Sequence, residues 1–522
     1  MHELVGVVRK NRTLLITLAV LALLLLMAIQ GLTTEEWVIT MMRGFALGAI
    51  TFLVASGLSL IFGLLDLLNL ANGTLFMIGA YVGWTMYIRP DTFVDLLAPV
   101  LLLVAGLLLR PAIDPVMARL ELGRRVGRVL PWVLLIIALA VALWAFVGWP
   151  IAKWDPGIPI QSPNTYALQM DQSIKGGPAR AIPEAAPAPG LLEAVAAFAG
   201  GVLLAASLSA FERQRAQLSR APLAWQRLIV PVILLILGVV VMVANTPLSE
   251  FLFGLSSTAI FLVAILVTIL VGAGLGGLME VTLIRPLYAR PIYQLMLTLG
   301  LGVAGIELVQ AIWGRPEFTM PKPAVFAGSG DACPAATVAD WLQYQCSTFL
   351  LVGGRLRVYN EVFIILVGLV VLVGVWLLLQ RSRIGMIIRA GVQDSAMVEA
   401  LGINVRRVFT FVFALGASLA ALGGVIAGPS MGLSPLMGES LFLSALIALV
   451  IGGLTSFPGA AAGSLLVGLL QQFIIRYGQN GINLPFLAEP FKPTPPLVPA
   501  STVLLMVIIL LILPQGLFGR RE

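Results

Sequence analysis

The chain has 522 residues, of which 59% are hydrophobic and only 11% are charged, and its formal net charge is +7. Globular proteins carry about a quarter charged residues, so this composition excludes an ordinary soluble enzyme. Apolar runs of the ~20 residues that a membrane helix needs recur along the whole chain, without the alternation typical of outer-membrane barrels. The sequence therefore predicts an all-α polytopic membrane protein, in which residues 1–522 form a single transmembrane domain.

Fourteen apolar segments are long enough to be transmembrane helices. In chain order they are 14–30, 44–62, 74–89, 95–110, 130–149, 190–210, 228–246, 252–281, 292–313, 358–380, 408–428, 440–456, 460–476 and 498–513. An even number of spans puts both termini on the same side of the membrane. With a cytoplasmic N-terminus, 21 of the 32 basic residues fall in cytoplasmic loops, in agreement with the positive-inside bias. These residues suit anionic lipid headgroups, so the positive charge indicates membrane lipid, and no nucleic acid, as the partner.

Three segments at the ends of spans have their own interpretation. No small-residue cleavage site follows 14–30, which predicts a retained first helix instead of a removed signal peptide. The proline-rich stretch 150–189 is expected to be an extracytoplasmic loop. The loop 314–357 is also expected outside, where its Cys333 and Cys346 either pair as a disulfide or remain two thiols.

Small residues recur at every fourth position in several spans, and this spacing lets helix backbones approach closely. One such series is Gly416, Ala420, Gly424 and Gly428. Tight packing is the main interpretation, and a gating pivot is the alternative. The span 252–281 would be ~45 Å long against a ~30 Å membrane core, so it is expected to tilt or to break at its glycine-rich stretch 272–277. The pair 440–456 and 460–476 fits either two full spans or a re-entrant segment.

The scarcity of reactive side chains excludes most catalytic chemistry. One histidine, His2, and two cysteines cannot build a zinc or iron–sulfur site or a catalytic triad in the membrane. A phosphate-binding P-loop needs a lysine directly after a glycine, and no lysine of this chain follows one. The chain is therefore expected to be no enzyme and to bind no cofactor or metal. If transport is driven by ATP, then ATP and Mg²⁺ bind to partner subunits.

The longest cytoplasmic loop between core spans, 381–407, is expected to carry a short amphipathic helix that ends at Leu401. Gly402 suits the position after a helix C-terminus, and Asn404 suits the N-cap of the next span. Charges stand between the apolar residues of this loop, a pattern that does not favour insertion into lipid. A surface helix with an apolar ridge fits a groove on a partner protein, and a helix lying on the membrane surface is the alternative.

Three polar residues at intervals of three follow the second predicted span, and they are Asp66, Asn69 and Asn72. One helical face would carry all three, which costs several kcal/mol in hydrocarbon unless the groups face a cavity or one another. Gly73 is expected to break the helix, and a broken helix beside a cavity is a common way to build a substrate path. The alternative is that Asn72 only caps the helix that starts at Thr74. The turn is expected on the cytoplasmic side, where it suits a gate.

Further acids interrupt other apolar runs. Glu280 is expected to end a helix beside a basic loop. Glu307 and Gln310 lie well inside the span 292–313, which makes them candidates for the translocation path. Glu439 is expected to be a solvated acid in the first turn of a helix.

Several motifs are more specific together, in this order, than any one of them alone. They are 44–63 followed by 69–81, then 280–287, Arg383-Ile384-Gly385 with Arg389-Ala390, Gln393-Asp394, Gly402-Ile403-Asn404-Val405, Gly452-Gly453-Leu454 with Pro458-Gly459, and 514–518. Through these motifs residues 40–90 and 255–518, about three fifths of the chain, resemble the permease subunits of branched-chain amino acid ABC importers. That family usually has a histidine and often an acid where this chain has Asn72 and Thr74, so no role of the imidazole is carried over.

The resemblance implies the transmembrane domain of an ABC importer in a bacterial inner membrane, with both termini cytoplasmic. The segment 91–250 is extra and contains four spans, which leaves about ten core spans in their orientation. The implied partners are a second, similar permease, two cytoplasmic ATP-binding subunits and an extracytoplasmic solute-binding protein. The loop 381–407 would couple to the ATPases, and transport would proceed by alternating access. The residues expected to serve in this coupling are Arg383, Gly385, Arg389, Asp394, Gly402 and Asn404.

Two questions stay open at this point. Branched-chain or other apolar amino acids are the expected solutes, and urea or short amides are the second choice within the same family. An ion-coupled secondary transporter or channel is the rival class, in which Asp66 and Glu307 would bind protons or cations. Such a protein would move its solute without any ATPase.

Overall fold

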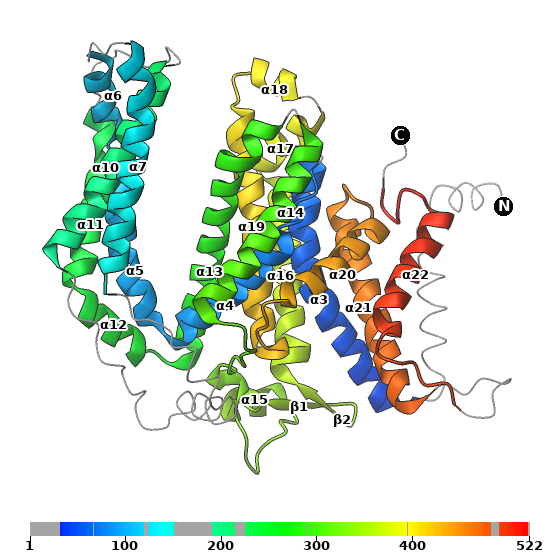
Figure 1. Ribbon diagram of the computed structural model, residues 1–522. Coiled ribbons are helices and arrows are strands. Elements are labelled where there is room, and N and C mark those ends of the chain that lie inside the picture. Colours follow the sequence, from blue (N-terminus) through cyan, green and yellow to red (C-terminus); the bar gives the residue numbers. More distant parts are fainter. Residues whose placement is uncertain are drawn as a thin grey trace. The chain divides into compact units, whose positions relative to one another are not determined.

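The computed structural model describes residues 32–65, 67–119, 124–150, 190–214, 225–288, 290–393, 395–481 and 490–519, most of which are helical (Figure 1). The expected first span 14–30, the segment 151–189, Asp66 and Asp394 lie outside these residues. Contacts between Cα atoms divide the chain into two compact units. A smaller unit lies between Thr85 and Ser256, and the larger unit contains the described residues on either side of it.

The larger unit contains most of the long helices. They are α3 (Thr34–Leu65), α13 (Ser257–Met279), α14 (Pro291–Trp313), α16 (Ile364–Arg381), α19 (Val405–Met431) and α21 (Phe457–Asn480). Three shorter helices accompany them, namely α4 (Asn72–Ile88), α20 (Met437–Gly452) and α22 (Leu497–Ile512). Helix α4 runs from the larger unit into the smaller one at its C-terminal end.

Every predicted span that falls within the described residues coincides with a helix, so the all-α prediction is confirmed. Among these residues nine helices are long and apolar enough to cross a membrane, or ten if the bent pair Ile229–Val243 and Asn245–Gly254 is one span. The count is lower than fourteen for a simple reason. Helices α4, α20 and α22 have only 17, 16 and 16 residues, and the first predicted span is not described.

Helix α3 is the centre of the larger unit and packs against α16, α19, α20 and α21. Small residues lie where helices of this unit cross, at positions where a larger side chain would collide with the neighbouring helix. A Cβ atom on Gly424 of α19 would lie 1.9 Å from the carbonyl oxygen of Phe76 of α4. One on Gly276 of α13 would lie 2.4 Å from the Cβ of Ala417. The tight-packing interpretation of the small-residue series is therefore confirmed.

Of the two expectations for the span 252–281, tilt or a break at 272–277, the break is wrong, because α13 is continuous through these glycines. Gly272 and Gly276 face α19 at backbone contact distance, and this packing holds the helix together where glycine alone would weaken it. The irregular part comes later, in the π-helical turn η2 (Glu280–Ile284) and the 3₁₀ turn η3 (Arg285–Leu287). The helix starts later than predicted, at Ser257, and with these two turns the span Ser257–Leu287 has 31 residues, so the expectation that it tilts stays a prediction.

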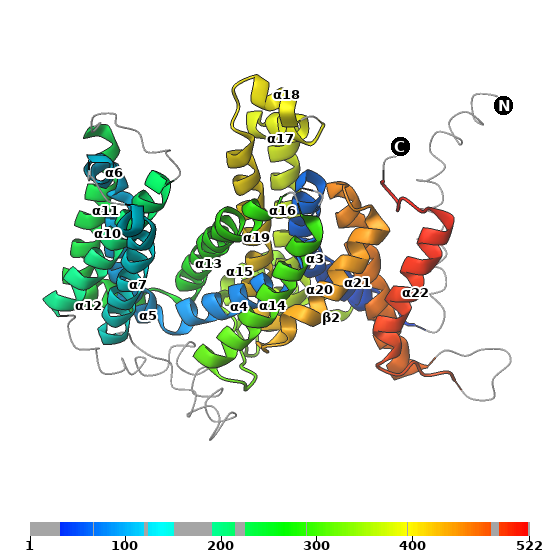
Figure 2. The same ribbon diagram turned by 45° about the horizontal axis from the view of Figure 1, so that its top comes forward.

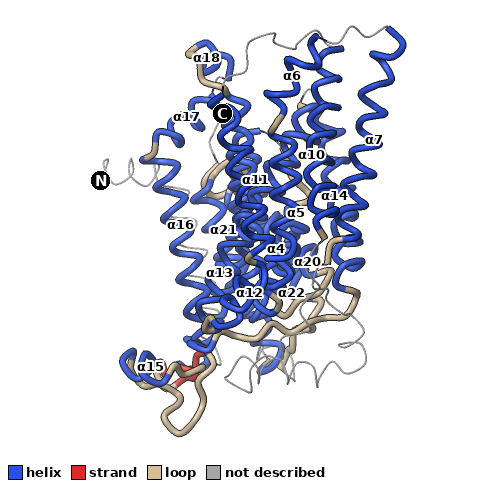
Figure 3. The backbone as a smooth tube through the Cα atoms, turned by 90° about the vertical axis from the view of Figure 1, so that its left-hand side faces the viewer, coloured by secondary structure: helices blue, strands red, loops and turns tan. Residues whose placement is uncertain are grey.

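The loop 314–357 folds into a small subdomain at one end of the larger unit (Figure 3). It contains η4 (Ala324–Phe326), α15 (Val338–Tyr344) and an antiparallel hairpin of β1 (Thr348–Leu351) and β2 (Gly354–Arg357). Cys333 and Cys346 form a disulfide with their Cα atoms 5.5 Å apart. The ring of Phe326 packs on Tyr359 of the π-turn η5 (Val358–Phe363), which attaches the subdomain to the start of α16.

The smaller unit is a helical bundle with its own apolar core. Its helices are α5 (Pro90–Leu108), α6 (Arg110–Arg119), α7 (Arg124–Gly148), α10 (Leu191–Gln214), α11 (Ile229–Val243) and α12 (Asn245–Gly254), with the 3₁₀ turn η1 (Trp225–Leu228) before α11. Inside the bundle the buried carboxylate of Asp95 accepts a hydrogen bond of 2.7 Å from Asn245 Nδ2. The four predicted spans of 91–250 correspond to α5, α7, α10 and α11, and their origin as an insertion stays a prediction.

Helices α20 and α21 form a hairpin through Gly453–Ser456. Gly453 has φ +107°, a value that favours glycine, and Ser456 caps α21 by accepting a hydrogen bond from Gly459 N. The two helices touch at their backbones, since a Cβ on Gly463 would lie 2.0 Å from Ala448 O. The choice between two full spans and a re-entrant segment stays open for 440–476.

Candidate functional site

The turn between α3 and α4 places polar side chains inside the larger unit. Asn69 and Asn72 are both fully buried. Asn69 Oδ1 accepts a hydrogen bond of 3.2 Å from Ala71 N, and Asn72 Nδ2 donates one of 3.1 Å to Val54 O on α3. The other amide atom of each side chain, Asn69 Nδ2 and Asn72 Oδ1, is buried and has no hydrogen-bond partner in the part of the chain that the structure describes. Buried polar atoms of this kind call for an explanation, such as a functional role, strain or a bound water.

Three expectations about this turn are wrong. Residues 67–71 are not helical, so Asn69 and Asn72 do not share a helical face, and Gly73 lies inside α4 instead of breaking it. The hydrogen bond from Ala71 N to the Asn69 side chain offers the backbone an alternative to the helix. Asn72 does not cap α4, because it is the first residue of the helix and its oxygen accepts no hydrogen bond from any described residue. A path role for both asparagines, and for Asp66, stays a prediction.

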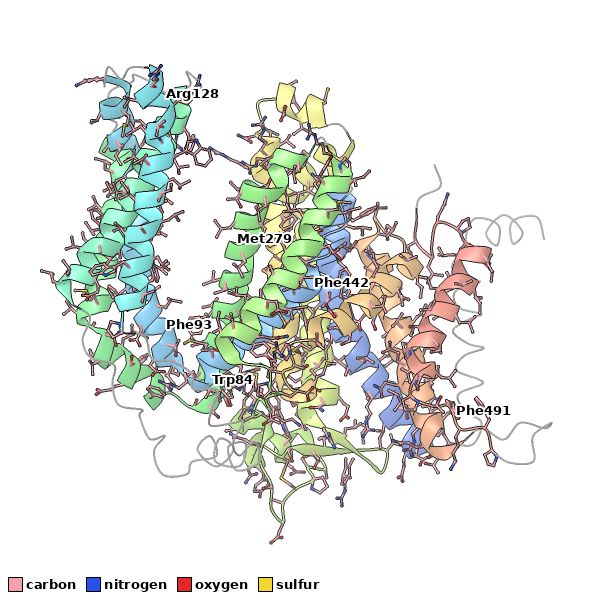
Figure 4. All side chains as sticks on the ribbon, in the orientation of Figure 1. Trp84, Phe93, Arg128, Met279, Phe442 and Phe491 are labelled. Atoms are coloured by element: carbon pink, nitrogen blue, oxygen red, sulfur yellow. A yellow bond between two sulfur atoms is a disulfide. The ribbon has the colours of Figure 1, made fainter. Side chains whose placement is uncertain are left out.

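A small open cavity of ≈160 Å³ lies beside this turn. Its walls come from α4, α14 and α20, and Thr74 Oγ1 at its edge donates a hydrogen bond of 3.2 Å to Gly302 O. Phe442 of α20, labelled in Figure 4, also lines it, together with Glu439. Glu439 is exposed in the first turn of α20, as predicted.

Glu307 does not face the helices of its own unit, and Gln310 lies at the edge of the face that does. The buried residues of α14 are Gln294, Thr298, Gly302, Ile306 and Val309, which define one face of the helix. Glu307 is exposed on another face, and Gln310 is half-buried. Their path role stays a prediction, and it would require a further chain beside α14, because an unpaired carboxylate is costly in lipid.

Glu280 forms a buried polar cluster, which we call the Glu280 cluster, with Arg285, Tyr288 and Thr410. Its carboxylate is fully buried and accepts two hydrogen bonds from Arg285, of 3.1 Å from Nε and 2.8 Å from Nη2. Thr410 Oγ1 of α19 donates a third at 2.7 Å, and the Tyr288 hydroxyl donates a fourth. Burial and the bond with Glu280 raise the pKa of Tyr288 above its usual range, so the phenol stays protonated.

The prediction that Glu280 ends a helix beside a basic loop is confirmed, since it follows Met279, the last residue of α13 (Figure 4). What the sequence did not reveal is the contact with Thr410, which lies 130 positions further along the chain. Below the cluster, Ile284, Phe413 and Ile61 pack together with Leu67 of the α3–α4 turn. The cluster thus joins α13, α19 and the buried asparagine turn at one end of the larger unit.

The loop 381–407 lies at the same end, where it follows α16 and precedes α19 (Figure 2). It forms α17 (Arg383–Gln393) and α18 (Ser395–Ala400), on either side of residue 394, instead of the single predicted helix. Gly402 has φ +81° directly after them. Asn404 Oδ1 accepts a hydrogen bond of 3.3 Å from Arg407 N and caps α19. Both predicted caps are therefore confirmed.

The apolar residues of this loop divide between two faces. Ile388 and Val398 are buried against the unit, whereas Met397 and Leu401 are exposed. Gly385 is buried because α17 folds back on the end of α16, where a Cβ would lie 2.3 Å from the carbonyl oxygen of Leu379. The charged residues Arg383 and Arg389 are exposed, and Arg389 Nη1 donates a hydrogen bond of 2.6 Å to Gln380. The loop thus presents exposed apolar residues with a basic rim, and Ile384 and Met386 of α17 are exposed as well.

Long apolar helices, buried polar clusters at one end and an exposed amphipathic loop define a multi-pass membrane protein of the permease type. Comparison with known families narrows the class. The family described as "Branched-chain amino acid transport system / permease component" matches residues 190–513, and the chain belongs to this family. No solved structure matches the chain.

Individual relatives of the chain are also named as permease proteins. The high-affinity branched-chain amino acid transport system permease protein LivH of Escherichia coli K12 is 29% identical over 219 residues, which cover 42% of this chain and 65% of LivH. BraD of Pseudomonas aeruginosa, named for the same kind of system, is 32% identical over 165 residues, which cover 31% of this chain and 49% of BraD. The fructose import permease protein FruF of Bifidobacterium longum shares 32% over 132 residues, which cover 24% of this chain and 36% of FruF. The chain thus spans less than two thirds of each of these relatives.

Proposed function

We propose that the chain is the inner-membrane permease subunit of an ATP-driven importer that moves branched-chain or other apolar amino acids into the cell. The family match to residues 190–513 carries the proposal. The exposed apolar residues with a basic rim on α17 and α18 support it, because a permease without its own nucleotide site needs a surface on which a motor protein can act. Branched-chain amino acids are preferred over urea or short amides because LivH and BraD are named for them.

The proposed assembly contains a second, similar permease, two ATP-binding subunits that hold ATP and Mg²⁺, and an extracytoplasmic solute-binding protein. The ATP-binding subunits would dock on the loop 381–407, where Met397 and Leu401 supply the apolar contact and Arg383 and Arg389 supply the rim. Both termini would then be cytoplasmic, together with this loop.

Alternating access needs a physical connection between the docked loop and the substrate path. The Glu280 cluster offers one, because Thr410 lies in the second turn of α19, directly after the loop, and is bonded to Glu280 at the end of α13. Leu67 packs below it and belongs to the same turn as the buried Asn69 and Asn72. Closure of the ATP-binding subunits would thereby shift α19, α13 and the asparagine turn together, and would favour one of two states of the pair of permeases.

The test begins with purification of the tagged full chain from its own membranes, and mass spectrometry identifies the proteins that co-purify. We expect an ATP-binding subunit among them. The complex, with the solute-binding protein added, is then reconstituted in proteoliposomes and supplied with [³H]leucine. We expect leucine accumulation that requires hydrolysable ATP and that excess leucine or valine, but not urea or acetamide, suppresses.

Two results would contradict the proposal. Accumulation of leucine by the purified chain alone, driven by a proton or sodium gradient, would identify an ion-coupled transporter in its place. ATP-driven uptake that urea suppresses and leucine does not would instead select the short-amide alternative.

A further inference from the structure

A second cavity lies at the end of the larger unit remote from the loop 381–407. It is open to one side and is lined by the N-terminal half of α3, Arg357 of β2, the turn η5, the start of α16, the end of α19 and the C-terminal half of α21. The loop 381–407 stands at the opposite ends of α16 and α19. The cavity volume of ≈250 Å³ corresponds to roughly eight water-sized volumes and matches a small amino acid such as valine or leucine.

The carboxylate in this cavity is fully paired, whereas the guanidinium beside it keeps donors unused by the described residues. Arg43 Nε donates a hydrogen bond of 3.2 Å to Glu361 Oε1, and the other carboxylate oxygen of Glu361 accepts one from Arg357 N. Glu361 is therefore occupied on both oxygens, and its side chain is only 4% exposed. The side chain of Arg43 is 46% exposed, and its two terminal nitrogens make no hydrogen bond to any residue that the structure describes. They can donate to an anion in the cavity in the bidentate geometry that guanidinium groups favour.

The local field is positive. Arg43 and Arg357 both line the cavity against the single carboxylate of Glu361. Nearby, burial lowers the pKa of Lys322, and the charge of Arg357 lowers it further, whereas Glu361 raises it. A carboxylate that enters the cavity would compensate this excess of positive charge.

The cavity also has an acceptor and an apolar wall. Asn360 Oδ1 is buried and has no hydrogen-bond partner among the residues that the structure describes. Leu47 and Ile50, which follow Arg43 on the same face of α3, and Met431 of α19 supply an apolar wall. A guanidinium with free donors, a free amide oxygen and an apolar wall together match the three parts of an apolar α-amino acid, which are its carboxylate, its ammonium group and its side chain.

We propose that this cavity is an outer solute site for α-amino acids with apolar side chains. In it Arg43 binds the carboxylate, Asn360 accepts from the ammonium group, and Leu47, Ile50 and Met431 contact the side chain. The site rests on the proposed function and adds to it a specificity element within the permease itself. It lies at the other end of the helices from the buried asparagine turn, so that a solute would meet Arg43 first and the asparagines last.

The test uses photo-leucine, a diazirine analogue of leucine, with the reconstituted complex. Labelled peptides are identified by mass spectrometry, and we expect labels in 34–65 and 354–381 that excess leucine removes. Excess 4-methylpentanoate, which lacks the ammonium group, should compete more weakly, and 3-methylbutylamine, which lacks the carboxylate, should compete least. Arg43→Gln should reduce the labelling by at least ~10-fold, because a charge-assisted bidentate contact is lost, and Arg43→Lys should restore part of it.

Two further variants separate binding from folding. Ala46→Phe fills the cavity from α3 without touching a charge, and it should abolish the labelling while the complex still assembles. Arg476→Gln is the matched control, because Arg476 of α21 pairs with Glu36 of α3 outside the cavity, and it should label like the wild type.

Unchanged labelling in Arg43→Gln and Ala46→Phe, or labels confined to other peptides, would overturn the site. If the reconstituted wild-type complex still imported leucine with ATP in that case, the proposed function would stand without the site. A wild-type complex that fails to import leucine would instead overturn the proposed function, and the site assignment would fall with it.

Discussion

Removing the charge of Glu280 should destabilise the permease more than removing any exposed acid. The Glu280 carboxylate is fully buried and accepts hydrogen bonds from Arg285, Tyr288 and Thr410. Breaking a buried ion pair by removing one partner costs about 3–5 kcal/mol. The side chain of Arg285 is 30% exposed, so water can compensate part of its lost pairing, and for Glu280→Gln we expect the lower end, about 3 kcal/mol.

Replacing the partner, Arg285, should destabilise the protein more than replacing Glu280. Arg285→Gln leaves a negative charge with no exposure to water and only Tyr288 and Thr410 as donors, so we expect a loss near the upper end of about 5 kcal/mol. In the double variant no unpaired charge remains, and its loss should be clearly smaller than the sum of the two single losses.

The assay is thermal unfolding of the purified full chain in detergent, followed by intrinsic tryptophan fluorescence. Glu439→Gln is the control, because Glu439 is an exposed acid in the first turn of α20. An unfolding midpoint for Glu280→Gln no lower than that of the control would refute the reasoning. Single losses that simply add in the double variant would show that the two side chains are not coupled.

Three further predictions concern other parts of the chain. Gly402→Val should reduce ATPase co-purification and uptake without reducing membrane insertion, because φ +81° costs a β-branched residue about 1–2 kcal/mol. Gly374→Val of α16, outside the loop 381–407, is the control, because a Cβ there meets no atom within 4 Å, and it should couple normally; equal behaviour of the two variants would refute the docking role. Cys346→Ser should remove about 3 kcal/mol of stability from the subdomain, seen as faster proteolysis, and dithiothreitol should accelerate cleavage of the wild type but not of the variant. Deletion of 91–250 should leave a reporter at Glu522 cytoplasmic, because four spans preserve parity, and a reporter outside would contradict the topology.

The sequence predicts the helices well because their signal is local. Long apolar runs define the spans, and a glycine or asparagine at the right offset defines a cap, as at Gly402 and Asn404. The sequence predicts poorly those features that depend on a contact between residues far apart in the chain. Thr410 could not be assigned to Glu280 from spacing, and the glycines 272–277 suggested a break because the sequence did not reveal α19 packed against them.

The faces that polar residues occupy in the spans are likewise hard to predict from the sequence. A period of three placed Asp66, Asn69 and Asn72 on one helical face, but a single hydrogen bond from Ala71 N to the Asn69 side chain accompanies a non-helical turn there. Glu307 was expected to face a lumen because it is charged. The helix face that it occupies depends on the neighbours of α14, which composition does not reveal.

The positions of the close contacts and of the buried charges indicate how the larger unit can transmit motion. Gly272 and Gly276 hold α13 at backbone distance from α19, so these two helices cannot slide apart without losing contacts along their length. The charged groups lie at the helix ends, with Glu280 near the loop 381–407 and Arg43 at the opposite end. We therefore infer that α13 and α19 move as one rigid pair. A gating pivot at 272–277 would break the closest packing in this pair, whereas a displacement at Thr410 would carry both helices and change the turn that holds Asn69 and Asn72.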